Sequence, residues 1–337
     1  MAAQLQNLTA LAVARRAALN DQTAGAVVYL SDQSHASIDR ALHILGFQAG
    51  QMRRIPTDSE YKMDTMQLAR AIREDLKSGL RPFAVVANAG TTNTGAIDPI
   101  QEIADTAQAN SIWLHVDAAY GGFAALTERG KKLLRGIDRA DSVVLDPHKW
   151  FYTPFETGCV IVRNGRLMRQ TFRILPDYMH DVAREEREVN FCDYGLQLTR
   201  SFHALKIWMA VKTFGAGRFR EVIDQCLDLT EYAAGVFERS PRIQVVTPPQ
   251  LGIFTFRYIP EKLPANMEVT DALIDEFNED LEKKILSSRK LMISSTRLRG
   301  RYVLRLCILN HRTRKADILA ALEIIECFGS EAEACLT

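Results

Sequence analysis

Short apolar segments alternate with amphipathic ones over the first 163 or so residues of this 337-residue chain, and this alternation constrains the fold most. The apolar segments have the length of single strands and lie at 26–30, 83–87, 112–117 and 142–145. Apolar residues at helical spacing predict helices at 5–19, 37–45, 64–77 and 99–109. Strands that are apolar on both faces and alternate with helices indicate an α/β fold, with a mostly parallel sheet covered by helices.

The pattern changes after residue 163. Residues 170–195 form a long, polar segment with little periodicity, which is typical of a functional or mobile loop. Beyond it we predict helices and strands in mixed order: helices at 199–214, 218–237, 270–287 and 313–328, and strands at 252–258 and 302–309. We therefore expect a large domain over residues 1–215, with a mobile loop at 170–195, and a smaller α+β domain over residues 216–337.

Composition argues against several classes of protein. The chain has 42 basic and 41 acidic residues, whereas a dedicated nucleic-acid binder normally carries a basic excess. No apolar run approaches the roughly 18 residues needed to cross a bilayer, and the charges near the N-terminus follow the apolar stretch instead of preceding it, unlike a signal peptide. The six cysteines are scattered without CxxC spacing, so we predict no metal site, no disulfide framework and a cytoplasmic location.

The first segment with chemical character is residues 146–150 (DPHKW), directly after the predicted strand 142–145. Ligands of open α/β sheets bind at the carboxyl ends of strands, so Lys149 is expected at the mouth of the sheet. A lysine that forms a Schiff base must lose its proton, and partial burial beside Trp150 and Phe151 favours that loss. Taken alone, the segment leaves open the alternative of an exposed surface lysine.

The second segment is residues 115–122 (HVDAAYGG), at the end of the predicted strand 112–117. His115 and Asp117 face the same way on a strand. A carboxylate at the end of a buried strand needs a cationic partner, and a protonated pyridine nitrogen is one. The small residues that follow leave room for a flat ring. A helix cap or a structural carboxylate remains the alternative for Asp117.

HVDAAYGG, followed about 24 residues later by DPHKW, resembles the group II pyridoxal-phosphate-dependent amino-acid decarboxylases. This family includes the aromatic amino-acid, histidine, glutamate and tyrosine decarboxylases. The resemblance implies a fold-type-I large domain followed by a smaller C-terminal domain, and pyridoxal 5'-phosphate as the cofactor. It extends to further segments of the chain: 7–11 (NLTAL), 31–35 (SDQSH), 89–92 (AGTT), 202–208 (FHALKIW) and 304–313 (LRLCILNHRT).

The resemblance implies three catalytic residues. Lys149 would carry the cofactor as a Schiff base. Asp117 would pair with the pyridinium nitrogen and keep it protonated, which makes the ring an electron sink. His35 would stack on one face of the ring, with Ala119 against the other face.

The resemblance also implies residues that bind the cofactor without taking part in the chemistry. Thr91 or Thr92 would hydrogen-bond near the ring, although a role in the turn alone is the alternative for either. His148 would lie beside the lysine, near the phosphate or the substrate, and Asp146 would belong to the same binding segment.

The sequence departs from the family pattern at three places. The glycine- and serine-rich phosphate-binding turn, and the segment before it, have no counterpart ahead of Leu5, so we expect weak cofactor binding by this chain and poor solubility or aberrant association. His203 stands where many members have arginine. Phe191 stands near the place of a catalytic loop tyrosine, although Tyr178 or Tyr194 could supply the same proton.

The function that the resemblance implies is decarboxylation of an L-amino acid to the amine and CO2. We expect an aromatic substrate, because the SDQSH and LNHRT segments resemble the aromatic branch more than the glutamate branch. Two alternatives stay open: oxidative deamination to an aldehyde on the same cofactor, and an inactive fragment that binds a partner subunit. We expect a homodimer without nucleic-acid or membrane partners. The identity of the amino acid is left open.

Overall fold

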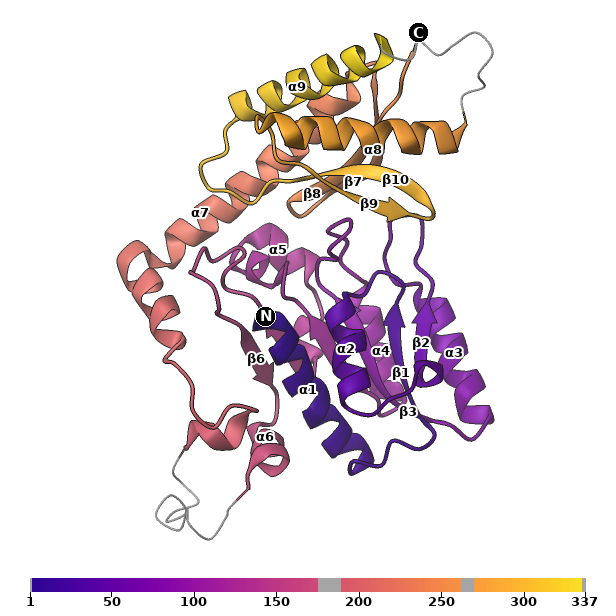
Figure 1. Cartoon of the computed structure of the whole chain (residues 1–337). Helices are drawn as coiled ribbons and strands as arrows, with labels where there is room; N and C mark the ends of the chain where they lie inside the picture. The colour runs from indigo at the N-terminus through magenta and orange to yellow at the C-terminus, as the bar shows by residue number, and fades with distance from the viewer. Residues whose placement is uncertain (1, 175–188, 262–269, 335–337) are drawn as a thin grey trace. The chain divides into compact units, whose positions relative to one another are not determined.

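The computed structural model describes residues 2–174, 189–261 and 270–334, without the side chains of Ala2 and Ala3. By its internal contacts the chain forms two compact units (Figure 1). The first unit comprises Met1–Thr91 and Ile97–Ala216, and the second comprises Thr92–Ala96 and Gly217–Thr337. Each unit is described by itself below.

The first unit is built on a six-stranded sheet in the order β2-β1-β3-β4-β5-β6. Every neighbouring pair is parallel except β5 with β6, which confirms the predicted, mostly parallel sheet. The four predicted strands are present, and two short strands join them at the sheet edges. The strands are β1 (Ala26–Ser31), β2 (Met52–Ile55), β3 (Arg81–Asn88), β4 (Trp113–Asp117), β5 (Ser142–Leu145) and β6 (Cys159–Val162).

Helices pack on this sheet in two groups, as Figure 1 shows. Helix α1 crosses β3 to β6 and packs on α2, whereas α3 and α4 pack on each other and on strands β2 to β4. Apolar residues at helical spacing form these contacts, and Asp64 caps α3 by accepting hydrogen bonds from the backbone N–H groups of Met66 and Gln67. The helices of this unit before α7 are α1 (Ala2–Leu19), α2 (Ala36–Ile44), α3 (Thr65–Lys77), α4 (Ile100–Ala109), α5 (Glu128–Leu133) and α6 (Gly165–Phe172).

A long helix, α7 (Ala204–Glu238), follows in the chain. Its backbone leaves helical geometry at Gly215, where φ is 74° and ψ is 153°. Residues with a side chain rarely adopt positive φ, so glycine is suited to this break. The break matches the predicted boundary between helices 199–214 and 218–237, although the first helix begins five residues later than predicted.

The second unit holds a four-stranded sheet in the order β7-β8-β10-β9, with every neighbouring pair antiparallel. This sheet, covered by helices, confirms the predicted smaller α+β unit. Phe237, Phe254 and Phe256 form edge-to-face and tilted ring contacts in its core. Its other elements are β7 (Ile243–Gln250), β8 (Ile253–Tyr258), β9 (Ser294–Leu298), β10 (Arg301–Cys307), α8 (Asp271–Ser288) and α9 (Lys315–Ala334).

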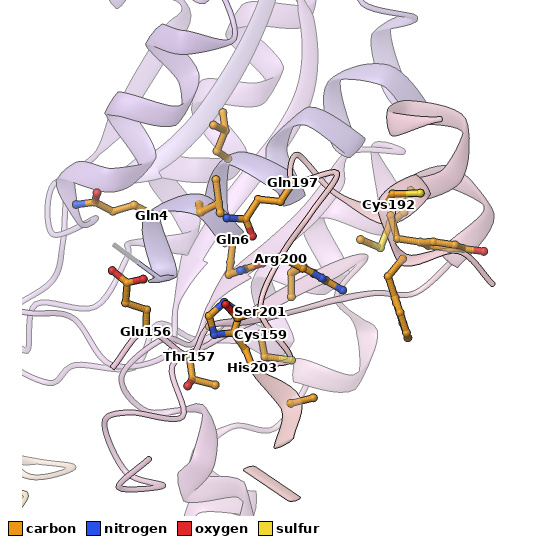
Figure 2. A pocket seen from close by; sticks show the side chains of 18 of the residues that line it. Gln4, Gln6, Glu156, Thr157, Cys159, Cys192, Gln197, Arg200, Ser201 and His203 are labelled. Carbon is orange, nitrogen blue, oxygen red and sulfur yellow. The ribbon is translucent and has the colours of Figure 1, made fainter. Parts of the chain in front are cut away.

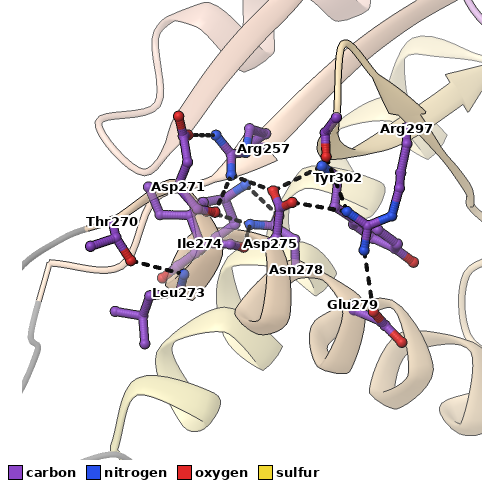
Figure 3. A network of polar contacts seen from close by, with 12 residues as sticks. Arg257, Thr270, Asp271, Leu273, Ile274, Asp275, Asn278, Glu279, Arg297 and Tyr302 are labelled. Atoms are coloured by element: carbon purple, nitrogen blue, oxygen red, sulfur yellow. Dashed lines mark hydrogen bonds and ion pairs between the residues drawn. The ribbon is translucent and has the colours of Figure 1, made fainter.

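A buried arginine ties β8 to α8 in the second unit (Figure 3). The Arg257 side chain is only 1% exposed, and its two terminal nitrogens donate to Asp271 Oδ1 at 2.6 Å and Asp275 Oδ1 at 2.7 Å. Asp275 also accepts from Arg297 at 3.0 Å and from the backbone N–H of Tyr302 at 2.8 Å. A charge that is buried this deeply needs such partners, so the network links α8 to both β8 and β10.

Among the described residues, no helix has both the length and the apolarity that crossing a bilayer requires.

Candidate active site

Four neighbouring parallel strands bring several predicted site residues to the same end of the sheet, where the carboxyl ends of these strands lie. Asn88, the last residue of β3, lies opposite Asp117, the last residue of β4, and Asp117 lies opposite Val144 of β5. The segment that carries Lys149 begins directly after β5. His35 follows β1 and Thr91 follows β3 in the same way. This edge is where open α/β sheets bind ligands.

Asp117 is a buried carboxylate, 7% exposed, that two donors hold in place. Its Oδ1 accepts from the backbone N–H of Ala119 at 3.1 Å, and its Oδ2 accepts from Asn7 Nδ2 at 3.0 Å. A carboxylate has about four lone-pair positions, so Asp117 can accept from a further donor such as a protonated ring nitrogen.

His115, two residues earlier on β4, is fully buried beside Asp117. Its Nδ1 lies 2.9 Å from Ser142 Oγ and its Nε2 lies 3.0 Å from Asn7 Oδ1. Burial lowers the pKa of His115 to about 4, although the nearby Asp117 opposes this shift. The imidazole is therefore neutral near pH 7 and acts as one donor and one acceptor.

Lys149 lies next to a second buried carboxylate. Its Nζ is 3.5 Å from Asp146 Oδ2, and His148 Nε2 is 3.6 Å from the same oxygen. The pKa of Asp146 is raised above its ordinary value, mainly because the carboxyl group is buried. The charges of Lys149 and His148 oppose this shift, and the charge of Asp117 adds to it. The Lys149 side chain is 32% exposed, so it is partly buried.

Three buried polar atoms around Lys149 have no hydrogen-bond partner among the described residues: Asp146 Oδ1, Trp150 Nε1 and Thr153 Oγ1. Buried polar groups without partners are rare, and each one calls for an explanation. The three atoms include an acceptor, a donor and a hydroxyl, so a ligand with polar groups would satisfy them. The partly buried amine of Lys149 and the carboxylate of Asp117 are the groups that pyridoxal phosphate needs from a protein, so the residues present fit this cofactor.

The two sequence motifs pack directly on each other. The rings of Tyr120 and Trp150 meet edge to face with centroids 5.7 Å apart. A Cβ atom on Gly122 would lie 2.1 Å from Leu145 Cδ2 and 3.0 Å from the Ala118 Cβ, so glycine permits this close approach. These contacts fix the segment that carries Asp117 against the segment that carries Lys149.

His35 caps the start of α2. Its Nδ1 accepts from the backbone N–H of Ser37 at 3.2 Å and lies 2.8 Å from Ser37 Oγ, while the residue itself is exposed. Thr91 is 2% exposed. Thr92 belongs to the second unit, where its carbonyl oxygen accepts a hydrogen bond from Arg305.

A separate cavity of about 1030 Å³ lies within the first unit (Figure 2). The start of α1, residues 156–160 and residues 191–207 contribute to its wall, which includes Phe191 and His203. Phe191 is 67% exposed and lies under the Arg200 guanidinium, 5.5 Å from the ring centroid, and His203 Nδ1 has no partner among the described residues. The predicted cofactor-binding residues do not line this cavity.

Part of the predicted mobile loop at 170–195 lies outside the described residues, namely 175–188, and so does Tyr178. Described parts of this region form α6 up to Phe172 and a short 3-10 helix at Phe191–Tyr194.

Sequence reasoning gave no role to Asn7, the first residue of the segment 7–11, which the structure places beside Asp117 and His115. A signal for it exists in the sequence. Asn7 stands three, four and seven residues before Ala10, Leu11 and Ala14, so it is a polar residue on the apolar stripe of α1. Its side chain is fully buried.

Comparisons with known proteins agree with this geometry. Residues 1–259 match the family described as pyridoxal-dependent decarboxylase conserved domain. The chain is 44% identical to aromatic-L-amino-acid decarboxylase of Bacillus atrophaeus over 97% of this chain and 67% of that protein. It is similar to Oryza sativa TDC in a crystal structure with PLP and tryptamine, with a TM-score of 0.90 and 29% identity over 97% of this chain and 69% of that one.

A third relative is an aldehyde synthase. The crystal structure of Rhodiola rosea 4-hydroxyphenylacetaldehyde synthase matches with a TM-score of 0.87 and 27% identity over 97% of this chain and 68% of that one. The chain spans between 58% and 67% of the length of the first three curated relatives that it matches. From the matched family region, the 44% identity and the shared fold, the chain belongs to the pyridoxal-dependent decarboxylase family, whose cofactor is pyridoxal phosphate.

Proposed function

We propose that this chain catalyses the pyridoxal-phosphate-dependent decarboxylation of an L-amino acid to its amine and CO2. The observation that carries the proposal is the arrangement at the sheet edge: the partly buried Lys149 lies 3.5 Å from Asp146, and Asp117 ends the neighbouring strand. The unpaired polar atoms around Lys149 support a polar ligand at this place.

When bound, the cofactor supplies a ring that takes up the electron pair left as CO2 departs. Lys149 would attach it through its amine. Asp117, fixed by Ala119 and Asn7, would hold a proton on the ring nitrogen, because an adjacent anion favours the charged form. His35 and Ala119 would bound the two faces of the ring.

The remaining residues would hold the cofactor and orient the substrate. Thr91 and Asp146 of the first unit would bind the cofactor, and His148 would lie near its phosphate or the substrate. The bond to the carboxylate must lie perpendicular to the ring to break readily, so residues that orient the substrate contribute to the rate.

An aromatic substrate is the most specific form of this proposal. Its support is that the Bacillus atrophaeus relative is an aromatic-L-amino-acid decarboxylase and that the Oryza sativa structure contains tryptamine. The experiment is to mix the purified chain and pyridoxal phosphate with L-tryptophan, L-tyrosine, L-phenylalanine, L-histidine or L-glutamate and to measure CO2 and amine. Lys149→Ala serves as the control that should release neither product.

We expect CO2 and amine in equal amounts from at least one aromatic substrate. Release from L-glutamate alone would contradict the aromatic assignment. No release from any substrate by a chain that carries the cofactor would contradict decarboxylation.

Aldehyde formation is the second candidate, and Phe191 is the observation that favours it. A tyrosine hydroxyl could return a proton after CO2 leaves, whereas phenylalanine cannot. The amino acid, O2 and water would then give the aldehyde, CO2, ammonia and hydrogen peroxide. Peroxide from the parent chain that falls in Phe191→Tyr, with a rise in amine, would support this route. Clean amine from the parent would reject it.

We further propose a cytoplasmic homodimer. Exposed apolar side chains of the first unit support an interface with a second copy: Phe155, Leu198, Phe202, Trp208, Met209 and Phe214 are each at least 54% exposed. The five cysteines in the described part of the chain carry free thiols, which is usual for a reducing compartment.

A further inference from the structure

We infer that Asn7 is the positioning residue shared by the two groups proposed to hold the cofactor ring, Asp117 and His35. This inference rests on the proposed function. Asn7 Nδ2 lies 3.0 Å from Asp117 Oδ2 and 3.0 Å from Ser37 Oγ, and Ser37 contacts His35. Asn7 is fully buried, so these contacts are made without competition from water.

The chemistry of the partners determines which way the Asn7 amide points. Asp117 as a carboxylate only accepts hydrogen bonds, so the Asn7 NH2 group must face it. The Asn7 carbonyl oxygen then faces His115 Nε2 at 3.0 Å, and that nitrogen must carry a hydrogen to donate. A flipped amide would place two acceptor oxygens against each other.

The same reasoning determines the tautomer of His115. A neutral imidazole has one N–H, and here it is on Nε2, so Nδ1 is the acceptor. Ser142 donates its hydroxyl hydrogen to Nδ1 at 2.9 Å, and Ser142 Oγ accepts from Trp113 Nε1 at 2.9 Å. A directed chain of hydrogen bonds therefore runs from Trp113 to Asp117, and its last link is Asn7.

The second branch reaches His35. Ser37 Oγ accepts from Asn7, which leaves its own hydrogen for His35 Nδ1 at 2.8 Å. The backbone N–H of Ser37 points to the same nitrogen at 3.2 Å. His35 Nδ1 is thus an acceptor, and its remaining N–H is on Nε2. The branch sets both the orientation and the tautomer of the exposed ring.

The arrangement gives Asn7 a specific effect on Asp117. Its NH2 group donates to Asp117 Oδ2 and so holds the carboxylate that is proposed to face the ring nitrogen in one orientation. Without Asn7, Asp117 keeps the Ala119 backbone N–H as its one described hydrogen-bond donor, and His115 Nε2–H loses its acceptor.

The first test uses nitrogen NMR of the histidine rings in the cofactor-free protein. In the parent, His115 should be neutral with its hydrogen on Nε2. Asn7→Leu, which keeps the side-chain size, should move or broaden the signals of both His115 and His35. Ser37→Ala should alter His35 and leave His115 unchanged. Thr9→Val is the matched control, since the buried Thr9 hydroxyl donates within α1 to the Leu5 carbonyl at 2.8 Å.

The second test compares the binding of pyridoxal phosphate with that of its 1-deaza analogue, in which a C–H group replaces the ring nitrogen. Asn7→Leu should reduce the preference for pyridoxal phosphate about tenfold or more, the usual size of one hydrogen bond to a charged group. Ser37→Ala should weaken both ligands equally and leave the preference unchanged. Should Asn7→Leu fail to fold, Asn7→Ser takes its place, because a hydroxyl on the shorter side chain cannot reach all three partners.

The outcomes separate this inference from the proposed function. A parent chain that binds no pyridoxal phosphate overturns the proposed function and the role of Asn7 toward the ring, whereas the NMR experiment still decides the network itself. A His115 that carries its hydrogen on Nδ1, or a preference unaltered by Asn7→Leu in a chain that binds the cofactor, overturns the inference alone.

Discussion

Asp117 is held by two donors before any ligand binds, so its carboxylate is oriented in advance. Preorganised charge of this kind acts mainly on the transition state. We predict that Asp117→Asn lowers kcat by about 10²-fold or more, with a smaller effect on the Kd for pyridoxal phosphate. Steady-state kinetics and cofactor titration of the same preparations measure the two effects.

The control for this substitution is Asp64→Asn at the start of α3. Asn caps a helix about as well as Asp, so this variant should keep normal kinetics. A near-normal kcat in Asp117→Asn would exclude the proposed electrostatic role.

His115 gives a pH prediction at the same scale. Its pKa in the folded state is about 4, below the ordinary value of 6.5, so protonation favours the unfolded chain. Its contribution to stability is present above pH 6.5 and is lost as the pH falls toward 4. At pH 5 the loss is about 2 kcal/mol, from 1.5 pH units at about 1.36 kcal/mol each.

His115→Gln removes this titration. We expect its free energy of unfolding to fall less between pH 7 and pH 5 than that of the parent. Urea unfolding followed by tryptophan fluorescence measures the first unit, because all three tryptophans lie there. Equal pH dependence in both proteins would argue against a buried, neutral His115.

The sequence motifs predicted only some of the residues that gather at the carboxyl ends of the strands. Asp117 and Lys149 stand at strand ends, where the chain itself indicates their location. Asn7 belongs to a helix far from them in sequence, and only the packing of α1 on β4 and β5 brings it to Asp117. Hydrogen-bond partners that are 110 residues apart cannot be read from local periodicity.

At the scale of elements, the strands that are continuously apolar and end at polar turns were predictable, whatever their length: β3 has eight residues and β5 has four. Strands β2, β6, β7 and β9 were not predicted. β2 has the sequence MRRI with two arginines, and β7 contains two consecutive prolines, so neither has the usual strand composition. Tertiary pairing with β1 and β8 makes them strands.

The arginine network of the second unit allows a prediction about α8 and its sheet. Arg257→Met should destabilise this unit by about 3–5 kcal/mol, because the negative charge of Asp275, a side chain that is only 16% exposed, loses a buried cationic partner. Arg297→Met in the same network should have an effect of at most about 1 kcal/mol, since that side chain is 56% exposed. Hydrogen exchange of peptides from β8 and β10 measures the loss of stability in both variants.

A similar loss of protection in the two variants would show that burial does not govern this network. An unchanged Arg257→Met would show that the ion pairs do not stabilise the unit.

At the scale of the whole molecule, the exposed apolar side chains at the start of α7 lead to a prediction about association. The parent should sediment as a homodimer at micromolar concentration. Replacing both Trp208 and Met209 by Glu should give a monomer, because charges on an apolar interface remain unpaired. Met66→Glu, at a 79% exposed position on α3, is the matched control. A monomeric parent, or a dimer that survives both changes, would contradict the proposed interface.

The central claim is that Lys149 carries the cofactor. The direct measurement is to add pyridoxal phosphate to the purified chain, reduce with borohydride, digest and locate the modified lysine by mass spectrometry. We predict the modification on Lys149, and its loss in Lys149→Arg. Modification of Lys206 or another lysine in place of Lys149 would contradict the account.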